Sequence, residues 1–172
     1  LQDKLQAVLN IDQSIAQKEK EKQQLYDSAS MLAQKISANR KKQVKPFEDK
    51  VNKLLHQVGM PNARIKTMIN PVELMETGAD NVEFLFDANV PAGDQAKGQF
   101  QPLRKVASGG ELSRLMLCIK SLVAQSVDLP TMIFDEIDTG ISGEAARQVG
   151  IIMKELAAKR QVICITHPPQ IA

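Results

Sequence analysis

Aromatic residues are scarce in this sequence, and their scarcity limits how a core can be built. The 172 residues include no Trp, one Tyr and five Phe, which is 3% of the chain. The apolar share is nevertheless 43%, enough for one domain of ordinary size. We therefore expect a core made mostly of Leu, Ile, Val, Met and Ala side chains.

Long apolar runs and a strong charge of either sign are also missing. No stretch of about 18 apolar residues exists, so we expect no membrane span, and no signal-peptide pattern opens the chain. The formal net charge is only +2, which by itself indicates no particular partner. The chain begins without Met and ends in Pro-Pro-Gln-Ile-Ala, so we expect it to be a piece of a longer protein.

Only two cysteines occur, Cys118 and Cys164, and both lie inside apolar segments. We expect buried, reduced thiols and a reducing compartment rather than a disulfide framework. Neither cysteine has a histidine at a zinc-like spacing, so a zinc site is not expected. His56 lies beside an apolar helix face, and we interpret it as a partly exposed surface residue.

Residues 1–45 have no Gly or Pro and are rich in Gln, Lys, Glu and Asp. Their apolar residues recur at spacings of three, four and seven, which predicts a seam along a long helix. We expect a first domain here, one arm of an antiparallel coiled coil, although a solvated surface helix would give a similar pattern. A basic cluster could contact a phosphate backbone or form a solvated helix face; it comprises Arg40, Lys41, Lys42 and Lys45.

Residues 46–172 are expected to form a second domain. Pro46 predicts a helix break or a new first turn, followed by a second helix that ends at Gly59. Strands are expected at 63–69 and 82–87, with a turn at 78–81 between them and a loop at 91–101.

From residue 108 onward the sequence predicts helix, strand, helix and strand. This order favours an α/β fold with a parallel sheet, right-handed crossovers and helices on both faces. The first helix should bury a stripe comprising Leu112, Leu115, Met116, Ile119, Leu122 and Val123. The second, at 144–156, should bury Ala146, Val149, Ile152, Met153 and Leu156.

The expected strand at 131–134 runs directly into Asp135 and Glu136. Ligands collect at the carboxyl ends of parallel strands, so both carboxylates should lie at the reactive edge. Asp135 suits Mg²⁺, and Glu136 could orient or deprotonate an attacking water. His167 follows the next strand and should reach the same edge, where an imidazole can bond a terminal phosphate. Taken singly, each of these residues could equally belong to an ordinary loop.

Ser108, Gly109 and Gly110 open the helix that precedes this strand. Serine is a good N-cap and glycine lets a backbone approach a ligand closely, so the helix end is a candidate anion site. A tight turn before a helix is the simpler interpretation.

The order and spacing of Ser-Gly-Gly-Glu, Asp-Glu, Asp-Thr-Gly-Ile-Ser and Thr-His resemble the head of ABC-type ATPases. The resemblance implies a Walker B strand at 132–135 with Asp135 as the Mg²⁺ ligand, a catalytic Glu136 and a switch histidine, His167. It also implies nucleotide-contacting residues in the signature motif and the D-loop: Ser108, Gly109, Gly110, Glu111 and Asp138.

The longer segments Ser-Gly-Gly-Glu-Leu-Ser-Arg and Ile-Thr-His-Pro-Pro-Gln-Ile-Ala more narrowly resemble the RecN family, bacterial DNA-repair relatives of the SMC proteins. The family's head is split by a long coiled coil, so the chain would be the C-terminal half of a head plus the returning arm. Pro168 departs from the leucine expected after the histidine. The bacterial cytoplasm, at the nucleoid, is the implied location.

The resemblance also implies a mechanism. Two heads would bind two ATP molecules with Mg²⁺ between them, the N-terminal half of the same head would supply the P-loop, and DNA would be the further partner. Ser108, Gly109 and Gly110 would then lie apart from the acids of their own chain and face the second head. No G-x-x-x-x-G-K-S/T motif occurs here, so we expect the chain alone to be inactive. Two alternatives stay open: the head of another ABC or SMC ATPase, and a non-catalytic interaction module.

Overall fold

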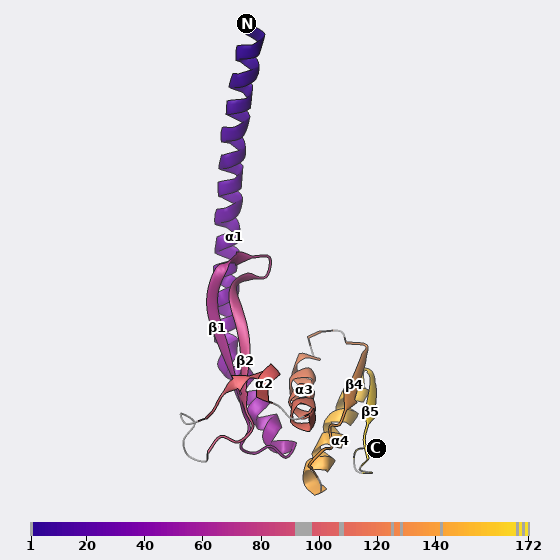
Figure 1. Ribbon diagram of the computed structural model, residues 1–172. Helices are drawn as coiled ribbons and strands as arrows, with labels where there is room; N and C mark the ends of the chain where they lie inside the picture. The colour runs from indigo at the N-terminus through magenta and orange to yellow at the C-terminus, as the bar shows by residue number, and fades with distance from the viewer. Residues whose placement is uncertain are drawn as a thin grey trace. The chain divides into compact units, whose positions relative to one another are not determined.

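One long helix, a three-stranded antiparallel sheet and a small α/β layer make up the fold. The computed structural model describes residues 2–91, 98–106, 109–124, 126–127, 129–141, 143–167, 169 and 171. The elements in chain order (Figure 1) are α1 (Gln2–Gln57), β1 (Arg64–Met75), β2 (Gly78–Asp87), β3 (Gln101–Pro102), α2 (Leu103–Val106), α3 (Gly109–Val123), β4 (Thr131–Asp135), α4 (Gly143–Ala157) and β5 (Gln161–Ile165). Two compact units divide the chain: Leu1–Lys42 with Ile69–Asn81, and Gln43–Met68 with Val82–Ala172.

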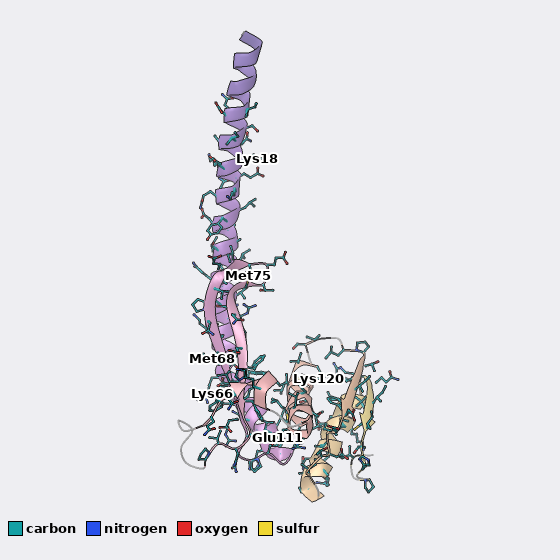
Figure 2. The ribbon with its side chains drawn as sticks, viewed as in Figure 1. Lys18, Lys66, Met68, Met75, Glu111 and Lys120 are labelled. Carbon is teal, nitrogen blue, oxygen red and sulfur yellow. The ribbon has the colours of Figure 1, made fainter. Side chains whose placement is uncertain are left out.

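The first unit contains most of α1 and the distal part of the β1–β2 hairpin. Its helix leaves the predicted seam exposed, with Ile15, Leu25 and Leu32 all more than half accessible. Lys18, labelled in Figure 2, pairs only locally, with Glu21 at 2.7 Å. The exposed apolar residues at helical spacing are what one arm of a coiled coil would present before its partner arm is in place.

Helix α1 continues through Pro46, so the predicted break there is wrong. A proline inside a helix removes one hydrogen bond and crowds the preceding turn, at a cost of about 3 kcal/mol. The residues that follow offset this cost because Val51 and Leu55 are fully buried in the core of the second unit. Each such side chain contributes about 1.5–3 kcal/mol when removed from water.

Gly59 ends α1 as predicted, in the left-handed conformation with φ of +82°. The Met60 amide donates to the Leu55 carbonyl at 2.9 Å, a bond from the second residue past the cap back to the last turn. A Cβ at Gly59 would lie 2.9 Å from Cβ of Ala145 and 3.1 Å from Cγ2 of Ile141. The backbone at the end of α1 therefore packs closely against the side chains of Ile141 and of Ala145, on the first turn of α4.

The antiparallel sheet has the order β1-β2-β3, with Leu85 opposite Pro102 and Phe86 opposite Gln101. The predicted turn at 78–81 is wrong: the turn is at residues 76–77 and β2 starts at Gly78, so β1 runs to Met75 instead of ending at 69. Asp80 is a strand residue because its carboxylate accepts bonds from Ser37 Oγ at 2.8 Å and Arg40 Nη1 at 3.2 Å.

The predicted α/β arrangement is confirmed in the second unit. Strands β4 and β5 pair in parallel, from Thr131 opposite Gln161 to Asp135 opposite Ile165. The inward residues of α4 are all buried as predicted: Ala146, Val149, Ile152, Met153 and Leu156. Helix α3 also contacts this layer, since Lys120 Nζ (labelled in Figure 2) lies 5.1 Å from the centre of the Phe134 ring.

The prediction that both faces of this sheet are covered does not hold for the described residues. Met132 and Phe134 are buried, but Ile133 on the opposite face of β4 is 60% exposed and Ile165 on β5 is 55% exposed. Successive strand residues point to opposite faces, so one face packs against the helices and the other is an open apolar surface.

The buried face of α3 also differs from the prediction. Leu112 and Val123, expected inside, are exposed. The residues fully buried on this helix are Gly110, Arg114, Leu115, Leu117 and Cys118. A charged residue, Arg114, is therefore among the buried residues, while Leu115, Ile119 and Leu122 of the predicted stripe still pack in the core.

Three smaller predictions concern single residues and membrane spans. Cys118 is buried and Cys164 is half-buried, both as free thiols, and burial raises the pKa of Cys118 to about 12. His56 is exposed, as predicted. Within the described ranges, no helix combines the length and the apolar character that crossing a bilayer requires.

Candidate functional site

The predicted site residues after β4 and β5 lie at one edge of the parallel sheet. Asp135, the last residue of β4, pairs in register with Ile165, the last residue of β5. Asp138 follows the first strand and His167 the second, so both continue from the same edge. The side chains of Asp135 and Glu136 are exposed there, as the carboxyl ends of parallel strands require for a ligand site.

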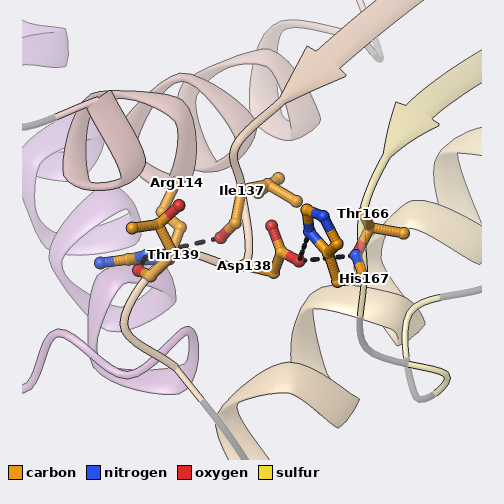
Figure 3. Close-up of polar contacts among 6 residues, drawn as sticks. All are labelled: Arg114, Ile137, Asp138, Thr139, Thr166 and His167. Carbon is orange, nitrogen blue, oxygen red and sulfur yellow. Dashed lines mark hydrogen bonds and ion pairs between the residues drawn. The ribbon is translucent and has the colours of Figure 1, made fainter.

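Asp138 and His167 are in direct contact (Figure 3). Asp138 Oδ2 accepts a hydrogen bond from the His167 amide at 2.8 Å and one from the Thr166 hydroxyl at 3.2 Å. The same oxygen lies 3.6 Å from His167 Nδ1. The His167 amide, followed by the other donors, lowers the pKa of Asp138 below its usual range. The His167 ring is 97% exposed, so it is held at its backbone and open to a ligand.

The turn after β4 has a well-defined internal geometry. Glu136 has φ of +53°, the only positive φ of a non-glycine residue in the described part of the chain. This region is strained for residues with a side chain and is often found at functional sites. Ile137 next to it is fully buried, and the Thr139 and Ile141 amides donate back to the carbonyls of Glu136 and Asp138 at 3.4 and 3.2 Å.

The N-terminus of α3 lies against this turn. A Cβ on Gly110 would be 2.8 Å from Cβ of Thr139, and a Cβ on Gly109 would be 2.5 Å from Oε2 of Glu136. The expectation that the glycines lie apart from the acids is therefore wrong: within one chain, Gly109 contacts the Glu136 carboxylate. The glycines permit this close approach because they have no side chain. Glu111 follows, half-buried on the first turn, whereas Ser108 and Pro168 lie outside the described residues.

Arg114 contacts the turn after β4, although the sequence pattern indicated no role for it. It is 5% exposed, and its Nη1 donates to the carbonyl of Thr139 at 2.6 Å and to that of Ile137 at 3.4 Å. Burial lowers the pKa of the guanidinium, while Glu111 raises it. The only sequence signal was a charge inside an apolar helical stripe, and it does not say which backbone atoms the charge meets.

The acids fit the chemistry of Mg²⁺. The described residues contain no group of three or more His, Cys, Asp and Glu side chains arranged to hold a metal. Asp135 and Glu136 offer exposed carboxylate oxygens, and Mg²⁺ commonly uses one or two carboxylates together with water and substrate phosphates. This donor set therefore suits a hard cation that is bound jointly with a phosphate.

The fold resembles that of Smc head domains. The chain superimposes on the Smc head domain with a coiled coil and joint from Pyrococcus yayanosii with a TM-score of 0.53 and 15% identity, covering 80% of this chain and 25% of that one. A second Smc head domain, from Pyrococcus furiosus, gives a TM-score of 0.51 at 18% identity, over 73% of this chain and 29% of the other. At these identities the likeness concerns the fold alone.

The sequence identifies the group within that class. The chain is 38% identical over 149 residues to DNA repair protein RecN of Vibrio cholerae, covering 86% of this chain and 26% of that protein. It is 35% identical over 174 residues to DNA repair protein RecN of Haemophilus influenzae, covering all of this chain and 30% of that protein. No protein-family model matches. The chain belongs to the RecN family and spans less than a third of the length of these relatives.

Proposed function

We propose that the chain is the C-terminal half of an ATPase head that hydrolyses ATP between two paired heads and acts in DNA double-strand-break repair. The observation that carries the proposal is the parallel pairing of β4 and β5, because it brings Asp135, Glu136 and His167 to one edge. The RecN relatives are named as DNA repair proteins, which supports the cellular role and a location at the bacterial nucleoid.

Each residue of the edge has a distinct part in this proposal. Asp135 would hold Mg²⁺, which supplies charge neutralisation for the phosphates when bound. Glu136 accepts a hydrogen bond from the attacking water and orients it. His167 donates to the terminal phosphate. In a pair of heads, the amides of Gly109 and Gly110 and the Ser108 hydroxyl meet the ATP held by the other head, where donors stabilise charge on the transferring group.

The N-terminal half of the head is the first partner that this function requires, because it would supply the P-loop. The open face of the β4–β5 sheet offers it an apolar surface of Ile133, Ile163 and Ile165. A groove on the opposite face, between β5 and α4, is a second exposed surface; its lining includes Ile151, Lys154, Val162, Cys164, Thr166 and Ile171. Aliphatic groups of this size contribute about 1.5–3 kcal/mol each when covered.

The second partner is DNA, and the basic cluster on α1 is its candidate contact. Arg40 is engaged within the first unit, with Nη2 donating to the Thr77 carbonyl at 2.9 Å in addition to its bond to Asp80. Lys45 pairs with Asp49 at 2.8 Å. Lys41 and Lys42 are exposed, so these two are the better candidates for contact with a phosphate backbone.

The test uses the full-length protein and the substitution Glu136→Gln. Removing the carboxylate that orients water should leave ATP binding unchanged and lower turnover by about 10²-fold or more. ATP-dependent dimers should accumulate in this variant, as measured by light scattering. The matched control is Glu144→Gln, an exposed glutamate on α4 that pairs with Arg147 at 3.0 Å and should leave turnover unchanged.

Two results would contradict the proposal. Normal turnover in Glu136→Gln would remove this residue from catalysis. Failure of the unmodified protein to hydrolyse ATP, together with dimers that persist in Ser108→Arg, would favour a non-catalytic interaction module.

A further inference from the structure

We infer that Arg114 is a positioning residue that fixes the turn carrying Asp138, and through Asp138 the backbone of His167, relative to the N-terminus of α3. The inference rests on the proposed function, because it links the helix end that would meet ATP of one head to the histidine that would meet ATP of the other. Figure 3 shows the contacts involved.

The first half of the connection runs from α3 to the turn. Arg114 Nη1 donates to the carbonyls of Thr139 and Ile137, at 2.6 and 3.4 Å. These two carbonyls belong to the residues on either side of Asp138. A buried cation is costly unless it is hydrogen-bonded, so both carbonyls are held toward the guanidinium. The peptide units that flank Asp138 are therefore fixed to the helix.

The second half runs from Asp138 to β5. One carboxylate oxygen accepts from the His167 amide and from the Thr166 hydroxyl, at 2.8 and 3.2 Å. A shift of the turn must either break these bonds or move residues 166–167 with it. A Cβ at Gly110 would lie 3.1 Å from the Thr139 carbonyl oxygen and 3.2 Å from Arg114 Nη1, so the first turn of α3 lies directly beside this hydrogen bond.

A purely space-filling role does not explain this arrangement. Arg114 Nε is buried without a hydrogen-bond partner, so the side chain is kept at a cost that an aliphatic residue would avoid. What the guanidinium provides and an aliphatic chain lacks is a donor for two carbonyls of one turn. The position of Arg114 on α3, six residues after Ser108, places that donor within the helix whose first turn would meet the phosphate.

The experiment compares Arg114→Lys and Arg114→Met with unmodified full-length protein and with Glu136→Gln. Lysine keeps one charged donor, and methionine keeps volume without a donor. The control is Arg64→Met, because Arg64 Nη1 also donates to two carbonyls, of Pro61 and Ala63, both at 2.7 Å. Readouts are the Kd for ATP, the fraction of ATP-dependent dimer, turnover per dimer, and the ¹⁵N signals of His167, identified with a His167→Gln variant.

We expect Arg114→Met to bind ATP normally and to lower turnover per dimer by about 10- to 100-fold, the effect of misplacing a catalytic group by roughly an ångström. Arg114→Lys should recover part of this loss, and the His167 signals should shift in Met more than in Lys. Arg64→Met should match unmodified protein in every readout. If Arg114→Met does not fold, Arg114→Lys alone tests the inference. Reduced turnover together with shifted His167 signals in that variant would support it.

Normal turnover and unshifted His167 signals in either folded Arg114 variant, with Glu136→Gln inactive, would overturn this inference and leave the proposed function intact. Equal losses in Lys and Met with unshifted His167 signals would also overturn it, because they would indicate packing alone. Absence of turnover in the unmodified protein would overturn both.

Discussion

At the scale of single residues, the candidate site contains one residue with an unfavourable backbone conformation and one carboxylate oxygen that accepts two hydrogen bonds. Glu136 has a backbone φ of +53°, a strained conformation for a residue with a side chain and one that is often found at functional sites. One carboxylate oxygen of Asp138 accepts two hydrogen bonds, from the Thr166 hydroxyl and from the His167 amide. The backbone at this edge is therefore held by contacts within the chain itself.

The depressed pKa of Asp138 predicts how the 138–167 contact depends on pH. Its folded pKa lies below the unfolded value, chiefly because the His167 amide donates to the carboxylate. The stabilisation is therefore fully present above the unfolded pKa and is lost as the pH falls through the folded pKa. The carboxyl ¹³C shift of Asp138 should titrate below an ordinary aspartate, and Thr166→Val should raise that midpoint. An ordinary midpoint in the unmodified chain would contradict this prediction.

At the scale of elements, the close approach of α3 to the 137–139 turn gives two neighbouring glycines different tolerance. A Cβ at Gly109 would meet only the end of the flexible Glu136 side chain, whereas a Cβ at Gly110 would meet Cβ and the carbonyl of Thr139. The end of the Glu136 side chain can rotate away, whereas Cβ and the carbonyl of Thr139 are fixed to the backbone. Alanine substitutions at the two glycines can therefore be compared directly, one expected to be tolerated and the other not.

Gly110→Ala should weaken the packing of α3 on the turn by about 1–3 kcal/mol, the usual cost of overpacking. Amide hydrogen exchange in α3 and in residues 137–141 should then speed up by roughly 5- to 150-fold, since 1.4 kcal/mol is a factor of ten. Gly109→Ala should leave exchange within about twofold of the unmodified protein. Equal effects of the two substitutions would contradict the packing argument.

Elements with regular apolar periodicity and no buried charge were predictable. All five inward residues predicted on α4 are buried, and the β4 and β5 strands begin and end within a residue of expectation. The stripe predicted on α3 was wrong at Leu112 and Val123, which are exposed, and it left out the buried Arg114, whose contacts with backbone carbonyls periodicity does not indicate. The turn at 78–81 was wrong because Ser37 and Arg40, forty residues earlier, hold Asp80 in the strand.

The candidate site, like the helices and strands, was only partly predictable from the sequence. Motif order and strand ends indicated which residues meet at one edge, because parallel strands fix their carboxyl ends together. The contact of Gly109 with Glu136 and the role of Arg114 were not predictable, since both depend on how two remote backbone segments pack. Continuity of α1 through Pro46 likewise depends on burial of the residues beyond it.

At the scale of the whole molecule, one face of the β4–β5 sheet in the second unit is apolar and exposed. Ile133 and Ile165 are more than half exposed, and Ile163 is 43% exposed. Surfaces of this kind mark interaction sites in folded proteins. Strand β5 pairs with β4 along one side in the described sheet, so its other side can accept a further strand.

Lysine at Ile165 should prevent assembly with the N-terminal half of the head. The side chain is exposed in this chain, so Ile165→Lys should leave its helical content unchanged, while a charge buried on assembly is strongly unfavourable. Co-expression of the two halves with different affinity tags should yield a complex for the unmodified pair and none for the variant. Val127→Lys, at an apolar residue 46% exposed outside the sheet, is the control. Unimpaired assembly of Ile165→Lys would place the partner elsewhere.

The missing side chain at Gly59 has a mechanical consequence. Since the end of α1 touches Ala145 and Ile141 directly, a rotation of the last turns of this long helix would reach the segment after Asp138 through one van der Waals contact. A displacement of the last turns of α1 would therefore press on the side chains of Ile141, which follows the 137–139 turn, and of Ala145, on the first turn of α4. A displacement of those two residues would in turn press back on the end of α1.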